Sequence, residues 1–156
     1  METVTATAST VPACLDALKA LLEAEPTLAS CKVFTAGADP SDMGTSSVVF
    51  HEPVEVECEY TIGTPMQLVS EEYDLGGVLE AVKAGGGEDT VKAARDAAYA
   101  VYASVCTVLS ENDTVSGVVT DARITSHKME QGAYEGEGRA CRISFTVHCR
   151  AKFQPA

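Results

Sequence analysis

Tryptophan is absent from this chain of 156 residues, and aromatic residues make up only 6% of it. The hydrophobic core must therefore be built mainly from the aliphatic residues and cysteine within a 46% hydrophobic composition. A chain of this length forms one ordinary domain and buries roughly 68–70% of its unfolded surface. It therefore needs neither disulfides nor a structural metal in order to fold.

Basic residues are scarce. The 11 Lys and Arg residues face 23 Asp and Glu residues, which gives a formal net charge of -12. A protein that reads nucleic acid normally carries a basic face, so this charge argues against such a function. For a free monomer, the ordinary interpretation of the acidic excess is solubility.

Long hydrophobic runs are also missing, and no stretch approaches 18 consecutive apolar residues. Residues 1–10 lack the basic start and the apolar run of a signal peptide. We expect a flexible arm over residues 1–10, followed by one domain over residues 11–156, with no membrane span and no secretory signal.

The six cysteines include no C-x-x-C pair, and most of them fall on apolar faces of periodic segments. Reduced, buried cysteine behaves as a small hydrophobic residue. We therefore predict six free thiols in a protein that is kept in a reducing compartment.

The hydrophobic periodicity predicts two helices, one from Val11 to Pro26 with Thr10 as N-cap, and one from Asp89 or Thr90 to Asn112. Strands are expected at 31–36, 47–50, 54–62, 78–83, 118–125 and 140–153. In this order, the elements indicate an α+β fold: a mainly antiparallel sheet with two α-helices packed on one face.

Residues for catalysis are few. None of His51, His127 and His148 stands in a metal-binding motif, and no G-x-S-x-G sequence occurs. The Gly85–Gly87 run precedes a helix but lacks the Lys-Ser/Thr of a phosphate-binding loop, so a tight turn explains it better. We expect no enzyme activity, no catalytic residues, no cofactor and no metal.

Two charged stripes stand out. Glu55, Glu57 and Glu59 alternate with apolar residues from Val54 onward, which predicts one acidic and one buried face on a single strand. The last strand presents a basic stripe of Arg142, His148, Arg150 and Lys152. The stripes could pair across neighbouring strands, or they could meet between subunits in a head-to-tail ring.

Residues 126–139 form a polar, glycine-rich segment that is too long for a tight hairpin turn. We expect a projecting loop that contacts a partner. Its candidate contact residues are His127, Lys128, Glu130, Gln131, Tyr134, Glu135, Glu137 and Arg139.

The C-terminal half contains VLEAVKAGGGEDTVKAARDAAYAVYASVCTVLSENDTVSGVVTDARI, followed by GRACRISFTVHCRAKF. This order of a strand closing on glycines, an Ala-rich helix, an NDTVSGVV turn and a long terminal strand resembles the tail terminator proteins of long-tailed, siphovirus-type bacteriophages, particularly those of actinobacterial hosts. The resemblance covers roughly residues 11–154, and the N-terminal helix fits it more loosely.

The resemblance implies a virion protein, assembled in the host cytoplasm, that forms a hexameric ring at the head-proximal end of the tail tube. Such a ring stops tube polymerisation and joins the tail to the head-completion proteins. Its expected partners are other copies of itself, the tail tube protein, the head-tail stopper or connector, and the end of the tape measure protein. Double-stranded DNA passes through the lumen without being read, so an acidic wall carrying Glu55, Glu57 and Glu59 is physically sensible.

Two alternatives stay open. The chain could be another neck protein of the same virion, such as a stopper or adaptor. It could also be a small cytosolic enzyme or ligand-binding α+β domain, which a pocket with converging His, Cys and carboxylate groups would favour.

Overall fold

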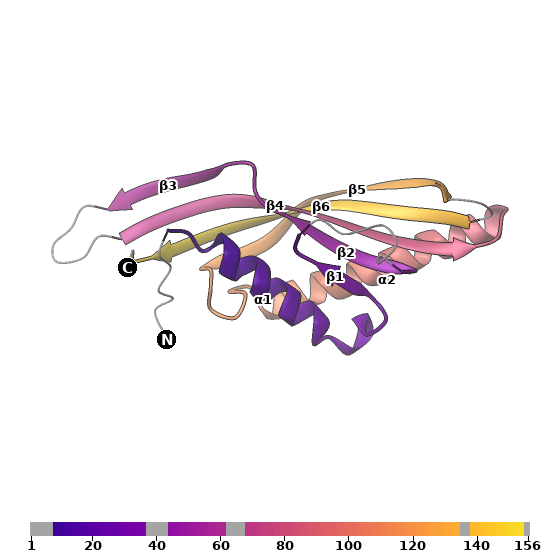
Figure 1. The fold of residues 1–156 in the computed structure, drawn as a ribbon, viewed down its shortest axis with the longest axis horizontal. Coiled ribbons are helices and arrows are strands. Elements are labelled where there is room, and N and C mark those ends of the chain that lie inside the picture. The colour runs from indigo at the N-terminus through magenta and orange to yellow at the C-terminus, as the bar shows by residue number, and fades with distance from the viewer. Residues whose placement is uncertain (1–7, 37–43, 62–67, 135–137, 155–156) are drawn as a thin grey trace.

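The computed structural model describes residues 8–36, 44–61, 68–134 and 138–154. Its elements follow one another along the chain as α1 (Val11–Glu23), the short 3-10 helix η1 (Pro26–Leu28), β1 (Lys32–Phe34), β2 (Ser46–His51), β3 (Val56–Thr61), β4 (Leu68–Ala84), α2 (Glu88–Glu111), β5 (Asp121–Tyr134) and β6 (Gly138–Phe153). Both helices lie on the same side of the sheet (Figure 1). No helix in these ranges is long and apolar enough to cross a membrane.

The six strands form one sheet in the order β1-β2-β4-β6-β5. The long strand β4 is shared along one edge: its C-terminal half pairs with β2 and its N-terminal half pairs with β3. Only the β1–β2 pair is parallel. The predicted α+β class, with a mainly antiparallel sheet and two helices, is therefore confirmed.

The core lies between the sheet and the helices. On β6, the alternating apolar residues predicted to face inward are buried, from Cys141 to Phe153. Those from Cys141 to Ala151 pack with Leu18 and Leu22 of α1 and with Val105 of α2 in the main core cluster. Val101 is only partly buried, at the margin of this cluster.

The Gly76–Gly77 pair lies inside β4, where the sheet is most closely packed. A Cβ atom at Gly77 would lie 2.3 Å from the Phe145 ring, whereas one at Gly76 would meet nothing nearer than 3.8 Å. The Phe145 ring also packs edge-on against Phe50, with ring centroids 5.9 Å apart. The missing side chain of Gly77 therefore leaves room for the Phe145 ring to lie over β4.

Helix boundaries agree with the periodicity, but the capping interactions differ. The N-cap of α2 is Gly87, and the hydroxyl of Thr90 donates to the carbonyl of Gly86. Thr10 precedes α1, but its side chain does not cap the helix. Thr10 is instead buried against Glu71 of β4, so the last residue of the predicted flexible arm belongs to the packed fold.

The prediction of a projecting loop over residues 126–139 is wrong. Residues up to Tyr134 belong to β5, and β6 begins at Gly138, so most of the segment is a long antiparallel hairpin. The irregular part precedes it: a turn over residues 113–120 includes Val115, Ser116 and Gly117 at positive φ. Glycine and polar residues argued for a loop, but pairing of residues 126–134 with residues 138–146 of β6 offsets their weak strand preference.

Candidate interface surfaces on the sheet

The predicted acidic stripe lies at an edge of the sheet. Glu57 and Glu59 are exposed on β3, directly opposite Glu72 and Ser70 of β4 on the face away from the helices. Glu55 is also exposed, but it precedes the first residue of β3. Because β4 lies between β3 and β6, the acidic stripe is not a cross-strand neighbour of the basic stripe.

The prediction that one face of β3 is buried is also wrong. Cys58 is exposed, and Tyr60 retains 59% of its accessible surface. These residues share the helix side of the sheet with Glu71 and Val69 of β4. At this end, among the residues that the structure describes, Val69 and Phe153 form a small buried cluster apart from the main core. Alternation identified the strand, but it could not show that little of the fold covers it.

The basic stripe on β6 is held by acidic residues from both neighbouring strands. Two nitrogens of Arg142 donate to Glu80 Oε2 of β4, at 3.1 and 2.9 Å. Arg150 lies 3.7 Å from Asp121 of β5. Lys152 lies opposite Ser70 of β4. The sequence did not identify the β4 carboxylates as partners, since residues 63–77 showed no clear periodicity.

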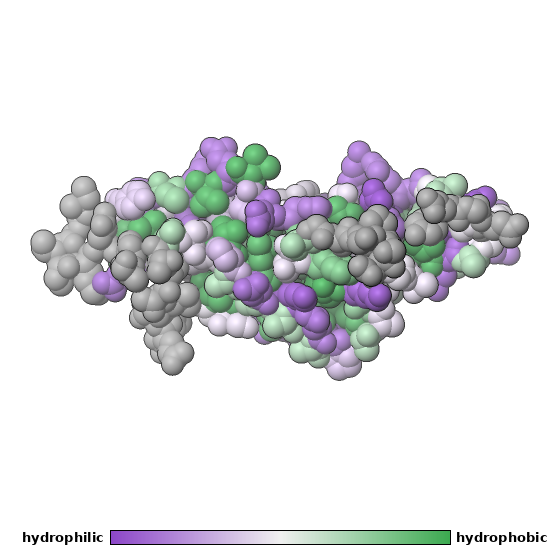
Figure 2. Space-filling model, viewed as in Figure 1, coloured by the Kyte–Doolittle hydropathy of each residue, from purple (hydrophilic) through white to green (hydrophobic). Residues whose placement is uncertain are grey.

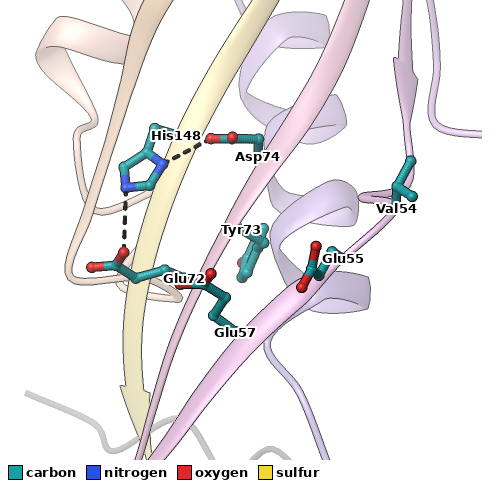
Figure 3. Close-up of a pocket in the computed structure, with 7 residues that line it drawn as sticks. All are labelled: Val54, Glu55, Glu57, Glu72, Tyr73, Asp74 and His148. Carbon is teal, nitrogen blue, oxygen red and sulfur yellow. Dashed lines mark hydrogen bonds and ion pairs between the residues drawn. The ribbon is translucent and has the colours of Figure 1, made fainter.

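His148 is the centre of an acidic hollow on this outer face (Figure 3). Its Nδ1 lies 2.7 Å from Asp74 Oδ1, and its Nε2 lies 3.9 Å from Glu72 Oε2. Glu55 and Glu57 also line this hollow, whose volume is about 360 Å³. Within the described residues no group of three or more His, Cys, Asp or Glu side chains is arranged to hold a metal ion.

The residues predicted for the contact loop lie mainly along β5. The His127 ring packs on Tyr102 of α2, with centroids 4.7 Å apart, and meets Tyr99 edge-on. Lys128 and Glu130 form an exposed ion pair of 3.3 Å, and Gln131 is also exposed. Tyr134 ends β5, Arg139 lies at the start of β6, and Glu135 and Glu137 fall outside the described residues.

A buried polar cluster on the helix side was not predicted. Glu71, only 1% exposed, accepts hydrogen bonds from the Thr10 backbone amide at 2.6 Å and from the Ser9 hydroxyl at 3.0 Å. The Thr10 hydroxyl also donates to Glu71, and the Tyr73 hydroxyl lies 3.0 Å from Thr10 Oγ1. The strand before Gly76 was not recognised, so no sequence signal marked Glu71 as inward-facing.

Two buried thiols extend this cluster. The thiols of Cys14 and Cys149 are hydrogen-bonded to each other, and this bond, followed by burial, raises the pKa of Cys149. The same bond lowers the pKa of Cys14. Burial, followed by the charge of a Cys14 thiolate, raises the pKa of Tyr73 above that of an ordinary tyrosine. The arrangement keeps Tyr73 and Cys149 protonated and favours a structural role.

The fold and these surfaces define a single-sheet α+β protein with one helix-covered face and one open, charged face. No family model and no curated protein matches the chain. The structure is similar to a chain in the virion of a native gene transfer agent (GTA) particle, with a TM-score of 0.36 and 13% sequence identity, over 88% of this chain and 94% of that chain. A TM-score below 0.5 does not establish a shared fold.

Proposed function

We propose that this chain is a structural protein of a long-tailed bacteriophage virion, without a catalytic role, that closes the head-proximal end of the tail tube as a hexameric ring. The sequence resemblance over residues 11–154 supports the proposal. The α+β architecture with both helices on one face agrees with what that resemblance implies.

The observation that carries the proposal is the incompletely covered end of the sheet. There, β3 and the start of β4 form the end of the sheet near the beginning of α1 (Figure 1). Val54 is fully exposed, Tyr60 is 59% exposed and Leu68 is 40% exposed. In the space-filling view, hydrophobic and hydrophilic side chains lie next to one another along the upper rim (Figure 2). Large apolar residues exposed along an edge strand and its partner are typical of a subunit that buries them in an assembly.

In the proposed ring, the acidic hollow on the helix-free face of the sheet, and not the Arg and Lys residues of the basic stripe on β6, lines the lumen. Glu55, Glu57, Glu72 and Asp74 are exposed on or beside this face. Carboxylates at a wet surface repel phosphate over a Debye length of roughly 8 Å at physiological salt. DNA in transit is therefore not gripped, and no sequence is read.

The hairpin of β5 and β6 is the proposed contact with a partner ring, either the tail tube protein or the head-tail stopper. Its two strands pair up to Tyr134 and Gly138. A long paired hairpin can hold its tip away from the core of the domain while the strands remain hydrogen-bonded. The end of the tape measure protein is a further proposed contact on the tube side.

Deletion of the gene from a phage that encodes this chain tests the proposal. Electron microscopy of the lysate should show tail tubes of unregulated length beside unjoined heads, and expression of the wild-type chain in trans should restore joined tails. If the deletion instead leaves tails of normal length that fail to join heads, the chain is a stopper or adaptor. Infectious particles at normal yield would contradict any neck function.

The hairpin requires a separate variant in the same complementation assay. Deleting residues 131–138 should leave a folded protein that does not join tails to heads. Lys92→Ala, at an exposed position of α2, serves as a control that keeps the hairpin complete. Normal yield of infectious particles with the deletion would exclude the hairpin from the partner contact.

A further inference from the structure

The sheet has two open edges in the half that contains β3. Its strand order there is β3-β4-β6-β5, and a single row crosses it through Val56, Tyr73, Cys149 and Ala122. Within the described ranges, β3 pairs only with β4, and β5 pairs only with β6. Open edges present unpaired backbone N–H and C=O groups, on which a further strand can form.

The directions of the two edge strands allow one copy to continue the sheet of another. All three pairings in this half are antiparallel, so β3 and β5 of one copy run in opposite directions. A second copy whose β3 lies beside β5 of the first therefore extends the sheet with another antiparallel pair. This contact joins two different surfaces, and repeating it produces a ring when the rotation closes.

The charges on the outer face of the two edges are complementary. On β3, Glu57 and Glu59 are exposed, and Glu57 faces the like charge of Glu72. On β5, the side chains of Arg123 and Lys128 are 64% and 76% exposed. Within the chain, Arg123 pairs with Asp121 at 3.8 Å and Lys128 pairs with Glu130 at 3.3 Å. Such surface pairs contribute little, so both cations can also interact with a neighbouring strand.

On the helix side of the sheet, β3 presents an exposed side chain and β5 borders a hollow that could receive it. Tyr60 is exposed on this side of β3. Beside β5, a hollow of about 380 Å³ is lined by Tyr102, Leu109, Ala122 and other residues of α2 and β5. This lining combines apolar groups with Ser110 and Asp113, which suits a phenol ring that has a polar tip.

One register of β3 against β5 brings together the opposite charges on the outer face and places Tyr60 beside the hollow on the helix side. If Glu59 lies opposite Arg123, antiparallel pairing places Tyr60 opposite Ala122, which lines the hollow. The same register places Cys58 opposite Ile124. Beyond the bulge of β5 between Ile124 and Ser126, Glu57 lies opposite Ser126, and Lys128 lies two residues further along the same face, diagonal to Glu57.

We propose that β3 of one copy pairs antiparallel with β5 of the next, with Glu59 opposite Arg123, Glu57 diagonal to Lys128, and Tyr60 seated between α2 and β5. The occupant of each edge is a second copy of this chain. The ring of the proposed function is the setting for this contact, although the contact itself is defined by the two strands.

Charge exchange between copies tests the pairing by native mass spectrometry. Glu57→Lys/Glu59→Lys and Arg123→Glu/Lys128→Glu should each lose the ring, because all their junctions bring like charges together. An equal mixture of the two variants should restore rings that alternate between them, since every junction then joins opposite charges. Circular dichroism should show both variants folded, as expected for exposed substitutions.

Matched controls carry the same charge changes away from the edges. Asp16→Lys/Glu23→Lys on α1 and Lys92→Glu/Arg95→Glu on α2 alter exposed positions and should keep the ring. Rings that persist in both edge variants would overturn this interface and leave the proposed ring intact. A wild-type chain that stays monomeric at every concentration and on isolated tails would overturn both.

A disulfide tests the register directly. Within one copy, Cys58 and position 124 are separated by three strand spacings, roughly 14 Å, which no disulfide spans. Oxidised Ile124→Cys should therefore give a covalent ladder that ends at the ring size, and Ile124→Cys/Cys58→Ser should give none. If Ile124→Cys rings form no ladder, the proposed register is wrong.

Discussion

The backbone amide of Thr10 donates a hydrogen bond of 2.6 Å to the carboxylate of Glu71, so the start of α1 is attached near the N-terminal end of β4. The Ser9 hydroxyl donates to the same carboxylate at 3.0 Å. A negative group at this position also interacts favourably with the positive end of the helix dipole. The buried Glu71 thus fixes where α1 begins relative to β4.

Replacing Glu71 should destabilise the protein although the change is small in volume. Glu71→Gln keeps one acceptor oxygen but loses charge-assisted hydrogen bonds, so the free energy of unfolding should fall by about 1–3 kcal/mol. Urea denaturation measures the change. The adjacent, exposed Glu72→Gln should alter it by less than about 0.5 kcal/mol. Equal effects at the two positions would contradict the role assigned to Glu71.

Alkaline pH should weaken the fold through Tyr73. Burial raises the pKa of Tyr73 in the folded state, whereas the unfolded chain loses this proton near pH 10. The stabilisation is therefore complete below about pH 10 and is lost as the pH rises above it. Tyr102, whose pKa burial raises to about 12, contributes with the same sign between about pH 10 and 12.

Urea denaturation across this pH range measures the effect. Tyr73→Phe should flatten the decline in the free energy of unfolding above about pH 10, although it loses the bond to Thr10 at neutral pH. Tyr60→Phe, at an exposed position, should leave the pH profile unchanged. An undiminished alkaline decline in Tyr73→Phe would exclude Tyr73 as the titrating group.

The two glycines of β4 should respond differently to the same substitution. Gly77→Ala places a Cβ atom 2.3 Å from the Phe145 ring and should cost roughly 1–3 kcal/mol through overpacking. Gly76→Ala meets no atom nearer than 3.8 Å and should be neutral or slightly stabilising in the same thermal melt. Comparable melting temperatures for the two variants would place Phe145 elsewhere.

Truncation of the core should be costly at two widely separated positions. Leu18 is 0% exposed and Phe145 is 3% exposed, and both belong to the main core cluster. Leu18→Ala and Phe145→Ala should each lower the free energy of unfolding by about 2–5 kcal/mol. Values below about 1 kcal/mol at both positions would mean that the core has been assigned to the wrong faces.

The cysteines should be distinguishable by accessibility. We predict that six thiols react in denaturant without reductant; fewer than six would indicate a disulfide. In the native protein, Cys58 should react first, because it is exposed while Cys14, Cys141 and Cys149 are buried. Cys58→Ser should remove this rapid phase, and Cys149→Ser should not.

The sequence by itself determined both helices and the buried face of β6. Alternation from Cys141 to Phe153 predicted which residues of β6 are buried, and the apolar stripes predicted α1 and α2. These patterns are local, because a period of two or 3.6 residues places neighbouring side chains on the same or opposite faces.

Only the tertiary structure decided what covers each face and which strands are neighbours. It left Cys58 and Tyr60 exposed, inserted β4 between the two charged stripes, and buried Glu71 beneath the start of α1. It also converted a polar segment into β5 by pairing it with β6. The physical reason is that burial and ion pairing depend on segments far apart in the chain, whose contacts the local sequence pattern does not encode.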